Sequence, residues 1–485
     1  MTLAALAALV LVLLLAVLDQ TIVAIALPTI VRELGELSHL SWVVTAYLLA
    51  STIVAPLYGK LGDMYGRKIV LQIAIVVFLV GSVLCGLSQT TAQLVLARGL
   101  QGIGGGGLIV TATAVVGDLV PPRERGRYQG IFGAVFGIAT IVGPPLGGLL
   151  VDHLSWRWIF YINLPTGAVA LFLVGAILRS RTPEQQRTID YLGAISLSVA
   201  LTAIVLCTSL GGTAIAWASL SVTGLLVLAI AGTITFIVAE IRADDPILPL
   251  GLLRNGTFAI ACAVTLIINV SLLGSVTYLP VYLQVVKGQN PSASGLQLLP
   301  MMLGMIVTSV ASGQIISRWG HLKPFPIAGT AIMAIGLAML SCLSSANPIW
   351  QTSGAAAVVG LGLGMVTQVL VLAAQNSVDF KDLGVATAGT ALFRSLGGAL
   401  GVAIFGAIFA NELHTHLGNV APADSDMISA AASSRLATLD RGMHTVYIES
   451  VAAALRPIFI FAAGTAAIAC VLACFLPQHP LQRAS

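Results

Sequence analysis

The sequence predicts an all-α integral membrane protein with 14 membrane-spanning helices. Of its 485 residues, 57% are hydrophobic and only 9% are charged, and the mean hydropathy is +0.98. A soluble domain carries about 25% charged residues, so this chain has more apolar surface than a water-soluble core hides. The second observation is a series of separate apolar runs, each near the roughly 20 residues that cross a bilayer as a helix.

These runs follow one another along the chain, separated by polar or charged loops. The first seven cover residues 3–29, 41–59, 69–87, 92–114, 128–151, 158–178 and 191–210. The other seven cover residues 216–239, 257–284, 296–316, 325–344, 349–372, 384–409 and 454–476. The first run has no basic flank before it and no small-residue cleavage site after it, so we expect a retained helix and not a signal peptide.

The basic residues of the loops predict the orientation of the helices. With the first loop outside, 15 of the 23 Lys and Arg residues lie on the cytoplasmic side and 6 lie outside, while Arg98 and Arg394 fall within helices. Lys and Arg concentrate in cytoplasmic loops. We therefore expect a multi-pass protein of the plasma (cytoplasmic) membrane with both termini in the cytoplasm.

An internal repeat divides the spans into two halves. Residues 59–68 read GKLGDMYGRK and residues 313–323 read GQIISRWGHLK, with Ser317 near the place of Asp63. Parallel halves with a site at their interface are an architecture of many secondary transporters. The predicted parts are a six-helix bundle over 1–180, two inserted helices over 181–256, and a six-helix bundle over 257–485 that includes an extracellular loop at 411–450.

Several motifs occur in order at matching helix positions. They are LDQTIVAIALP (18–28), GKLGDMYGRK (59–68), LARGLQGIGGG (96–106), GPPLGG (143–148) and WRWIFYINLP (156–165). Together they resemble the fourteen-helix drug:proton antiporter branch (EmrB/QacA type) of the major facilitator superfamily (MFS), over nearly the whole chain. The resemblance implies two pseudo-symmetric MFS bundles with two inserted central helices.

Asp19 is the candidate proton-coupling residue, because it is the one carboxylate placed deep in a predicted span. Ionisable groups inside a membrane are costly and usually functional. Arg98 is the candidate partner, since an intramembrane Arg faces the bundle interior and needs a counter-charge. The resemblance also places this Arg beside the proton path. A structural ion pair between the two residues is the alternative, and both roles can coexist.

The loop after the second span is the candidate conformational latch. Its carboxylate, Asp63, can accept hydrogen bonds from a neighbouring helix N-terminus and pair with a guanidinium. Such a contact would hold one state and release in the other. A solvated, topology-setting basic loop is the alternative. The latch residues are Gly59, Asp63, Gly66, Arg67 and Lys68, with Asp118 and Arg127 as candidate partners.

The GPPLGG motif resembles the antiporter motif of the fifth helix. It combines Pro144 and Pro145 with Gly143, Gly147 and Gly148. Proline kinks a helix, and glycines let backbones approach closely. We expect a dry seam between this helix and SLGGALG (395–401) in the thirteenth span, which would discourage proton leak. Ordinary small-residue packing is the alternative.

The substrate cavity is the part that the sequence indicates most weakly. Neutral amides, aromatic rings, a thioether and one Arg lie in the spans, and such groups can line an adaptable site. The candidates are Tyr47, Gln101, Asn269, Tyr278, Met305, Gln368 and Arg394. Each of them can equally serve plain helix packing.

The predicted function is proton-coupled secondary export of an amphiphilic small molecule, such as a drug, by alternating access. No Walker motif, catalytic constellation or metal-ligand spacing occurs, so we expect no enzyme activity, no metal and no cofactor other than the proton gradient. The expected partners are an amphiphilic or lipid-like substrate, protons and membrane lipids, without nucleic acid, and we expect a monomer. Export of a lipid or cell-envelope precursor and a non-transporting sensor or scaffold are the alternatives.

Overall fold

The computed structural model describes residues 3–34, 40–178, 190–211, 219–289, 291–344, 347–418 and 441–477. Within these ranges, 14 helices are long and apolar enough to cross a membrane, which confirms the predicted count and the all-α fold class.

The first half contains spans one to six. Its helices are α1 (Leu3–Leu34), α2 (Leu40–Tyr65), α3 (Arg67–Leu87), α4 (Thr91–Leu119), α5 (Arg125–His153), α6 (Trp158–Tyr161) and α7 (Asn163–Ile177). The short α6 and the longer α7 together form the sixth span. Glycines in α4 allow close packing on α2 and α3, because a Cβ on Gly102 would lie 2.4 Å from the Tyr47 carbonyl oxygen.

The second half contains the last six spans. Its elements are α10 (Gly256–Val281), a π-helical turn η3 (Tyr282–Val286), α11 (Pro291–Leu296), α12 (Leu299–Trp319), α13 (Pro324–Ser341), α14 (Ile349–Asn376), a 3₁₀ turn η4 (Phe380–Asp382), α15 (Leu383–Gly418) and α17 (Arg441–Cys474). A further 3₁₀ turn, η2 (Leu250–Arg254), precedes α10.

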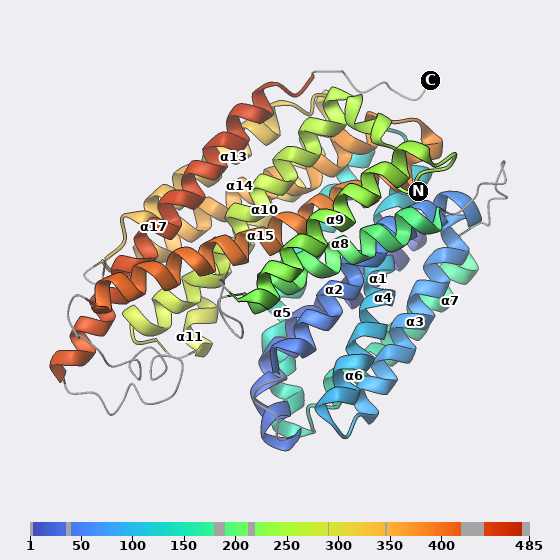
Figure 1. The fold of residues 1–485 in the computed structure, drawn as a ribbon. Coiled ribbons are helices and arrows are strands. Elements are labelled where there is room, and N and C mark those ends of the chain that lie inside the picture. Colours follow the sequence, from blue (N-terminus) through green and yellow to red (C-terminus); the bar gives the residue numbers. More distant parts are fainter. Residues whose placement is uncertain are drawn as a thin grey trace.

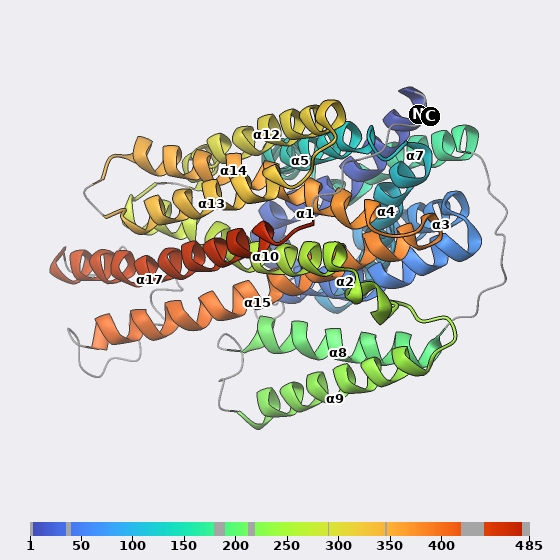
Figure 2. The same cartoon turned by 90° about the horizontal axis from the view of Figure 1, so that it is seen from above.

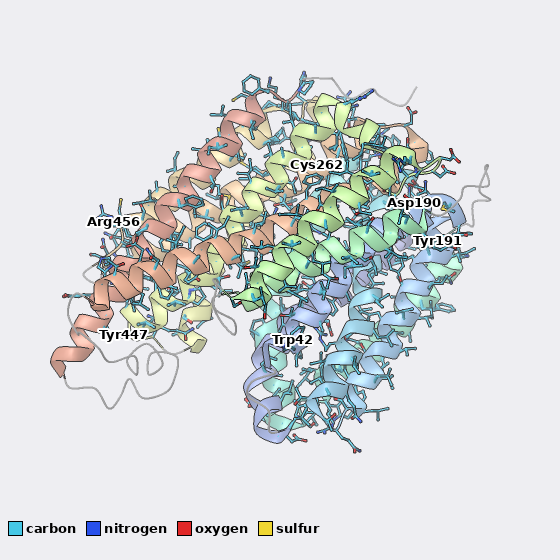
Figure 3. The ribbon with its side chains drawn as sticks, viewed as in Figure 1. Trp42, Asp190, Tyr191, Cys262, Tyr447 and Arg456 are labelled. Carbon is cyan, nitrogen blue, oxygen red and sulfur yellow. The ribbon has the colours of Figure 1, made fainter. Side chains whose placement is uncertain are left out.

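The inserted helices α8 (Tyr191–Leu210) and α9 (Leu220–Arg242) form a pair beside the two halves (Figure 2). The α8 helix contacts both α2 and α15, so it touches each half. Their outer faces are apolar, and Tyr191 is 70% exposed on the outside of α8 (Figure 3). An apolar face of this kind suits contact with lipid.

The predicted extracellular loop at 411–450 is shorter in the structure. Residues 411–418 continue α15, and residues 441–450 form the first turns of α17. The remaining part of this prediction, 419–440, lies outside the described residues. The apolar-run criterion missed these extensions because they are polar, whereas backbone hydrogen bonding continues a helix without apolar side chains.

Each copy of the internal repeat places a glycine with a positive φ between two consecutive helices. Gly66 follows α2 with φ 90°, and Gly320 follows α12 with φ 75°. Both angles lie in a region that glycine enters without the Cβ clash of other residues. The second glycine of each repeat therefore makes the tight turn between consecutive helices of its own half.

Each half has its own apolar core. In the first half, buried side chains such as Phe78 and Leu108 pack between α1, α3 and α4. In the second half, Cys262 is buried among residues of α10, α13, α14 and α17 (Figure 3). Between the halves, α2 packs on α15 and α5 packs on α12.

The two halves lie close together at one end of the molecule and diverge toward the other (Figure 1). We call the first of these the basic end, because it carries Lys60, Arg67, Arg123 and Arg125. The opposite end carries α6 and α11, where the ribbons of the halves are farthest apart (Figure 1).

Candidate functional site

Asp19 and Arg98 form a buried ion pair inside the first half. Arg98 Nη1 donates to Asp19 Oδ2 over 2.7 Å, and the side chains are 2% and 0% exposed for Arg98 and Asp19 respectively. Arg98 Nε also donates to the Val43 carbonyl of α2 over 3.3 Å. Asp19 lies on α1 and Arg98 on α4, so the pair joins these two helices through residues that are 79 positions apart in sequence.

Two amide side chains complete the coordination of Asp19. Its Oδ1 accepts hydrogen bonds from Gln101 Nε2 over 2.8 Å and from Asn163 Nδ2 over 2.9 Å. Both amides also donate to Ser82 Oγ, over 2.7 and 3.2 Å. Three donors, from Arg98, Gln101 and Asn163, therefore satisfy the two oxygens of this carboxylate. We call Asp19, Arg98, Gln101, Asn163 and Ser82 the Asp19 cluster.

The sequence analysis missed Asn163 and Ser82 and assigned Gln101 and Tyr47 to a substrate cavity. In the structure Gln101 belongs to the Asp19 cluster, and the Arg98 guanidinium lies 4.3 Å from the centre of the Tyr47 ring. Tyr47 is 1% exposed, so its ring covers the ion pair. Asn163 could have been found, because it is the polar residue of the quoted WRWIFYINLP motif that falls inside a span.

A second acid near this half, Glu33, has a different role. It accepts a hydrogen bond from Trp156 Nε1 over 2.7 Å and pairs with Arg157 at the opposite end. The hydrogen bond from Arg157 lowers the pKa of Glu33 below its ordinary value. Glu33 is therefore a charged, structural residue and not a second member of the buried pair.

The glycines of the GPPLGG motif pack on α1 close to Asp19. A Cβ on Gly143 would lie 2.1 Å from Thr21 Oγ1, and one on Gly147 would lie 3.1 Å from Ile22 Cγ2. Thr21 Oγ1 also donates to the Ala139 carbonyl of α5 over 3.3 Å. Pro144 and Pro145 lie within α5.

The expected seam between GPPLGG and SLGGALG is not formed in this structure. Gly397 and Gly401 of SLGGALG pack on α10 instead. A Cβ added to Gly397 would lie 2.2 Å from the Leu266 carbonyl oxygen, and one added to Gly401 would lie 2.5 Å from the Val270 carbonyl oxygen. Gly148 has open space around it. The glycines of each motif therefore pack against a helix of their own half. A glycine motif permits close approach of a backbone, but it does not determine which helix lies opposite.

Asp63 joins the two halves at the basic end. Its Oδ1 accepts from Gly384 N over 3.2 Å and its Oδ2 from Val385 N over 3.1 Å, which are the first free amides of α15. Arg67 Nη2 donates to Asp63 Oδ1 over 2.5 Å, and Arg67 Nε donates to Asp118 Oδ2 over 2.7 Å. The carboxylate thus lies at the positive end of a helix dipole and beside a guanidinium.

The other predicted latch residues are placed as follows. Gly59 faces α15, where an added Cβ would lie 2.5 Å from Ala388 Cβ. Gly66 makes the turn described above, and Lys68 Nζ donates to the Gly175 carbonyl of α7 over 2.7 Å, within the first half. Arg127 does not reach Asp63; its backbone N donates to Ser317 Oγ of α12 over 3.0 Å.

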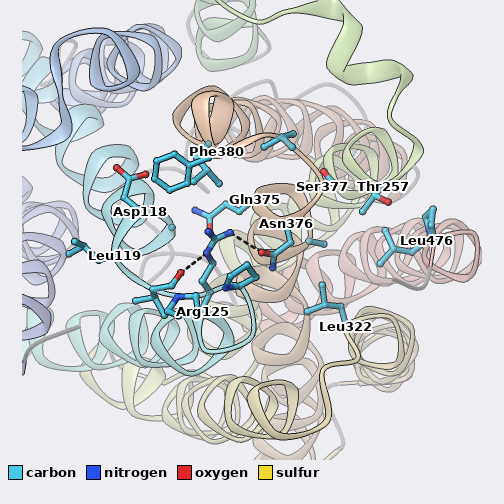
Figure 4. A pocket seen from close by; sticks show the side chains of 18 of the residues that line it. Asp118, Leu119, Arg125, Thr257, Leu322, Gln375, Asn376, Ser377, Phe380 and Leu476 are labelled. Atoms are coloured by element: carbon cyan, nitrogen blue, oxygen red, sulfur yellow. Dashed lines mark hydrogen bonds between the residues drawn. The ribbon is translucent and has the colours of Figure 1, made fainter. Parts of the chain in front are cut away.

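Further hydrogen bonds join the halves at the basic end. Arg125 Nη1 donates to Asn376 Oδ1 of α14 over 2.8 Å, and Arg123 Nε donates to the Ser317 carbonyl over 3.1 Å. Beside these contacts lies a cavity of about 710 Å³, into which Asp118 and Gln375 project (Figure 4). None of the predicted substrate-cavity residues lines it.

Two of the predicted cavity residues do meet, in a narrow space that we call the central cavity. Gln368 and Arg394 line it together with Thr113 and Phe136 of the first half. The three other candidates of the second half lie elsewhere. Asn269 donates to the Thr265 carbonyl, Tyr278 stacks on Phe409 with ring centres 5.1 Å apart, and Met305 packs against the main apolar core.

Comparison with known proteins agrees with this architecture. Residues 9–402 match the family model of the Major Facilitator Superfamily. The chain is 42% identical to an uncharacterised MFS-type transporter of Mycobacterium tuberculosis, over 96% of this chain and 68% of that protein. The chain belongs to the major facilitator superfamily. This confirms the resemblance drawn from the motifs.

Two further comparisons extend the assignment. The chain is 39% identical to the multidrug transporter protein MdtP of Bacillus subtilis, over 81% of this chain and 72% of MdtP. The solved structure of the MFS proton:xylose symporter XylE aligns over 98% of this chain and 96% of XylE, with a TM-score of 0.61 and 16% identity, and it shows the fold alone. This MFS chain is therefore a multi-pass membrane transporter and not an enzyme.

Proposed function

We propose that this MFS transporter exports amphiphilic small molecules in exchange for protons, with Asp19 as the proton-coupling group. The observation that carries the proposal is the Asp19 cluster, in which a fully buried carboxylate holds a fully buried guanidinium. Relatives named as multidrug transporters support the export of small molecules.

The chemistry of the cluster supports proton binding at Asp19. When Asp19 is ionised, the pair is neutral overall and both carboxylate oxygens accept hydrogen bonds. A proton on the carboxylate removes one acceptor charge and leaves Arg98 without its counter-ion in a low-dielectric interior, which is unfavourable. Protonation therefore favours a second conformation in which Arg98 contacts other partners. A transport cycle needs such a difference, in which binding of a proton changes the relative stability of two conformations.

Helix α5 connects this event to the contact between the halves. Its outer section packs on α1 through Gly143, beside Thr21 and two residues from Asp19. Its inner section packs on α12 through Gly130, where an added Cβ would lie 2.5 Å from the Ser309 carbonyl. Movement of α1 relative to α4 can thus be transmitted along a rigid helix to the basic end.

The basic end is assigned to the cytoplasm in this proposal, because Lys and Arg concentrate on that side. The described conformation then has its halves joined on the cytoplasmic side and diverging outward. In this state Asp63 serves as the latch that holds the cytoplasmic side closed. Proton entry from outside supplies the energy, since a charge moving through the membrane potential gains about 2.3 kcal/mol per 100 mV.

The test is dye accumulation in cells that express the wild type or Asp19→Asn, with and without a protonophore. Asn keeps the size of Asp19 but cannot exchange a proton, so we expect at least a tenfold loss of extrusion, equal to that caused by the protonophore. Asp152→Asn is the matched control, because Asp152 is an exposed acid of the same half. It should extrude like the wild type.

Folding and coupling are separated by a second measurement. Purified Asp19→Asn should elute as a single species and still bind the dye in the absence of a gradient. Full dye extrusion by Asp19→Asn, or extrusion by the wild type that persists with the protonophore, would show that proton coupling through Asp19 is wrong.

A further inference from the structure

Arg394 is a second cation deep within the membrane-spanning part of the chain. It lies about 17 Å along α15 from Leu383, where that helix begins. This distance is about half of the roughly 30 Å hydrocarbon core. Arg394 therefore lies near the middle of the bilayer, where a charged side chain usually marks a substrate or ion pathway.

The Arg394 side chain lies where the two halves meet. It lines the central cavity with Thr113 of α4 and Phe136 of α5 from the first half, and with Gln368 of α14 from the second. The guanidinium carbon is 5.8 Å from the centre of the Phe136 ring, which is within cation–π range. An alternating-access transporter holds its substrate at this kind of interface.

Arg394 differs from Arg98 in having no anionic partner. Arg98 is paired with Asp19, whereas in the described part of the chain no ion pair or hydrogen bond joins the Arg394 side chain to another residue. No Asp or Glu lines the central cavity. Arg394 is half-buried, and a charge partly withdrawn from water is stabilised by a counter-charge, so the cavity favours an anion.

The hydroxyl groups around the cavity do not compete for that role. All five threonines that line it donate their hydroxyl protons to backbone carbonyls of the preceding turn, and they are Thr113, Thr265, Thr367, Thr387 and Thr390. The Gln368 side chain is 7% exposed and makes no hydrogen bond to another described residue. The donors left for a ligand are therefore the Arg394 guanidinium and the Gln368 amide.

We infer that the central cavity, whose volume of about 20 Å³ in this conformation must increase as the halves separate, binds the anionic group of an amphiphilic substrate, with Arg394 and Gln368 as donors to that group and Phe136 in contact with its apolar body. The inference rests on the proposed exporter function and gives it a substrate class, a small amphiphile with one carboxylate or similar anion. A guanidinium binds a carboxylate with two parallel hydrogen bonds. A neutral ester of the same molecule lacks the charge, and a cationic analogue is repelled.

The test uses three pyrene probes that differ in charge: pyrenebutyrate, its methyl ester, and a pyrene trimethylammonium of similar length. Binding to the purified protein is measured by fluorescence titration at pH 8, without a membrane gradient. We expect the wild type to bind the carboxylate at least about tenfold more tightly than the ester, and the cation most weakly.

Variants of Arg394 test whether this side chain sets the preference. In Arg394→Gln the carboxylate and the ester should bind within about twofold of each other, whereas Arg394→Lys keeps the charge and should keep most of the preference. Gln368→Leu removes the second donor and should lower carboxylate binding by a smaller factor, about threefold. A thermal melt of each purified variant checks that it is folded.

The outcomes are separable from those of the proton-coupling test. Asp19→Asn should keep the preference for the carboxylate while it loses export, because binding needs no gradient. Equal binding of carboxylate and ester by the wild type, or an unchanged preference in folded Arg394→Gln, would overturn the inference. Preferred binding of the cation would overturn it as well.

Discussion

Two contacts between the halves at the basic end are related by the internal repeat, and they differ in charge. In the first, α2 packs on α15 through Gly59. In the second, α12 packs on α5 through Gly313, where an added Cβ would lie 2.3 Å from the Gly126 carbonyl. Both glycines are the first residue of their repeat, so close backbone approach is a shared feature of the two contacts.

The residue four positions after each glycine shows the difference. Asp63 accepts hydrogen bonds from the amides that begin α15, and Ser317 accepts one from the Arg127 amide near the start of α5. Asp63 is also paired with Arg67. In the second repeat the position of Arg67 is taken by His321, which contacts only the nearby Trp319 carbonyl.

The comparison teaches that one fold can carry a strong and a weak version of the same contact. Hydrogen bonds to a charged group contribute about twice as much as neutral ones. The α2–α15 contact therefore contains a charged acceptor and an ion pair, while the contact of α12 with the start of α5 relies on glycine packing, a neutral hydrogen bond to Ser317 and donation from Arg123 to the Ser317 carbonyl.

The largest effect is expected for Asp63→Ala. It removes three hydrogen bonds and leaves Arg67, whose side chain is 9% exposed, with Asp118 alone. The hydrogen bonds from Gly384 and Val385 join the halves, and each bond to a charged group contributes about 1.5 kcal/mol, so the state with the basic end closed should lose about a hundredfold in population. Pulsed EPR distances between spin labels at the basic ends of α3 and α13 measure this population. An unchanged distance distribution would contradict the latch.

An intermediate effect is expected when either first glycine of the repeat becomes valine. The Cβ of Gly59→Val would lie 2.5 Å from Ala388 Cβ, and that of Gly313→Val would lie 2.3 Å from a carbonyl oxygen, so the helices must separate. Both variants should reduce transport several-fold and open the basic end. Gly464→Val in α17 is the control, because Gly464 has open space around it. Loss of transport in the control alone would refute the packing argument.

The smallest effect is expected for Ser317→Ala. It removes one neutral hydrogen bond to the start of α5, which contributes about 1 kcal/mol. Transport should fall by less than about fivefold, and the same EPR labels should show only a slight opening. Ser317→Asp sharpens the comparison, since a carboxylate at this helix start should favour the closed basic end. If Ser317→Ala were as damaging as Asp63→Ala, charge would not distinguish the two contacts.

Parts of the site could be predicted because they depend on local chemistry. A carboxylate in an apolar run requires a partner, and Arg98 was the available base within the same half. Asp63 lies within a motif rich in glycine and basic residues, which predicts contact with a helix start and a guanidinium. These inferences need the residue types and their positions along a helix, but no knowledge of helix rotation.

Other parts could not be predicted because they depend on which helix faces lie opposite. Asn163 reaches Asp19 from 144 positions away in the chain, and Ser82, 63 positions from Asp19, accepts hydrogen bonds from Asn163 and Gln101. Gln101 was predicted to line a cavity, yet its helix face turns it into the Asp19 cluster. The GPPLGG glycines contact α1 and not the thirteenth span for the same reason.

By itself the sequence determined the membrane as solvent, the 14 spans, the division into two halves and the superfamily, because apolar length and short motifs are local properties of the chain. Only the tertiary structure decided which polar groups share a site. It placed three donors on Asp19, gave Arg98 a counter-charge and gave Arg394 none among the described residues. The physical reason is that a hydrogen bond needs its atoms within about 3 Å, and that distance is set by helix packing.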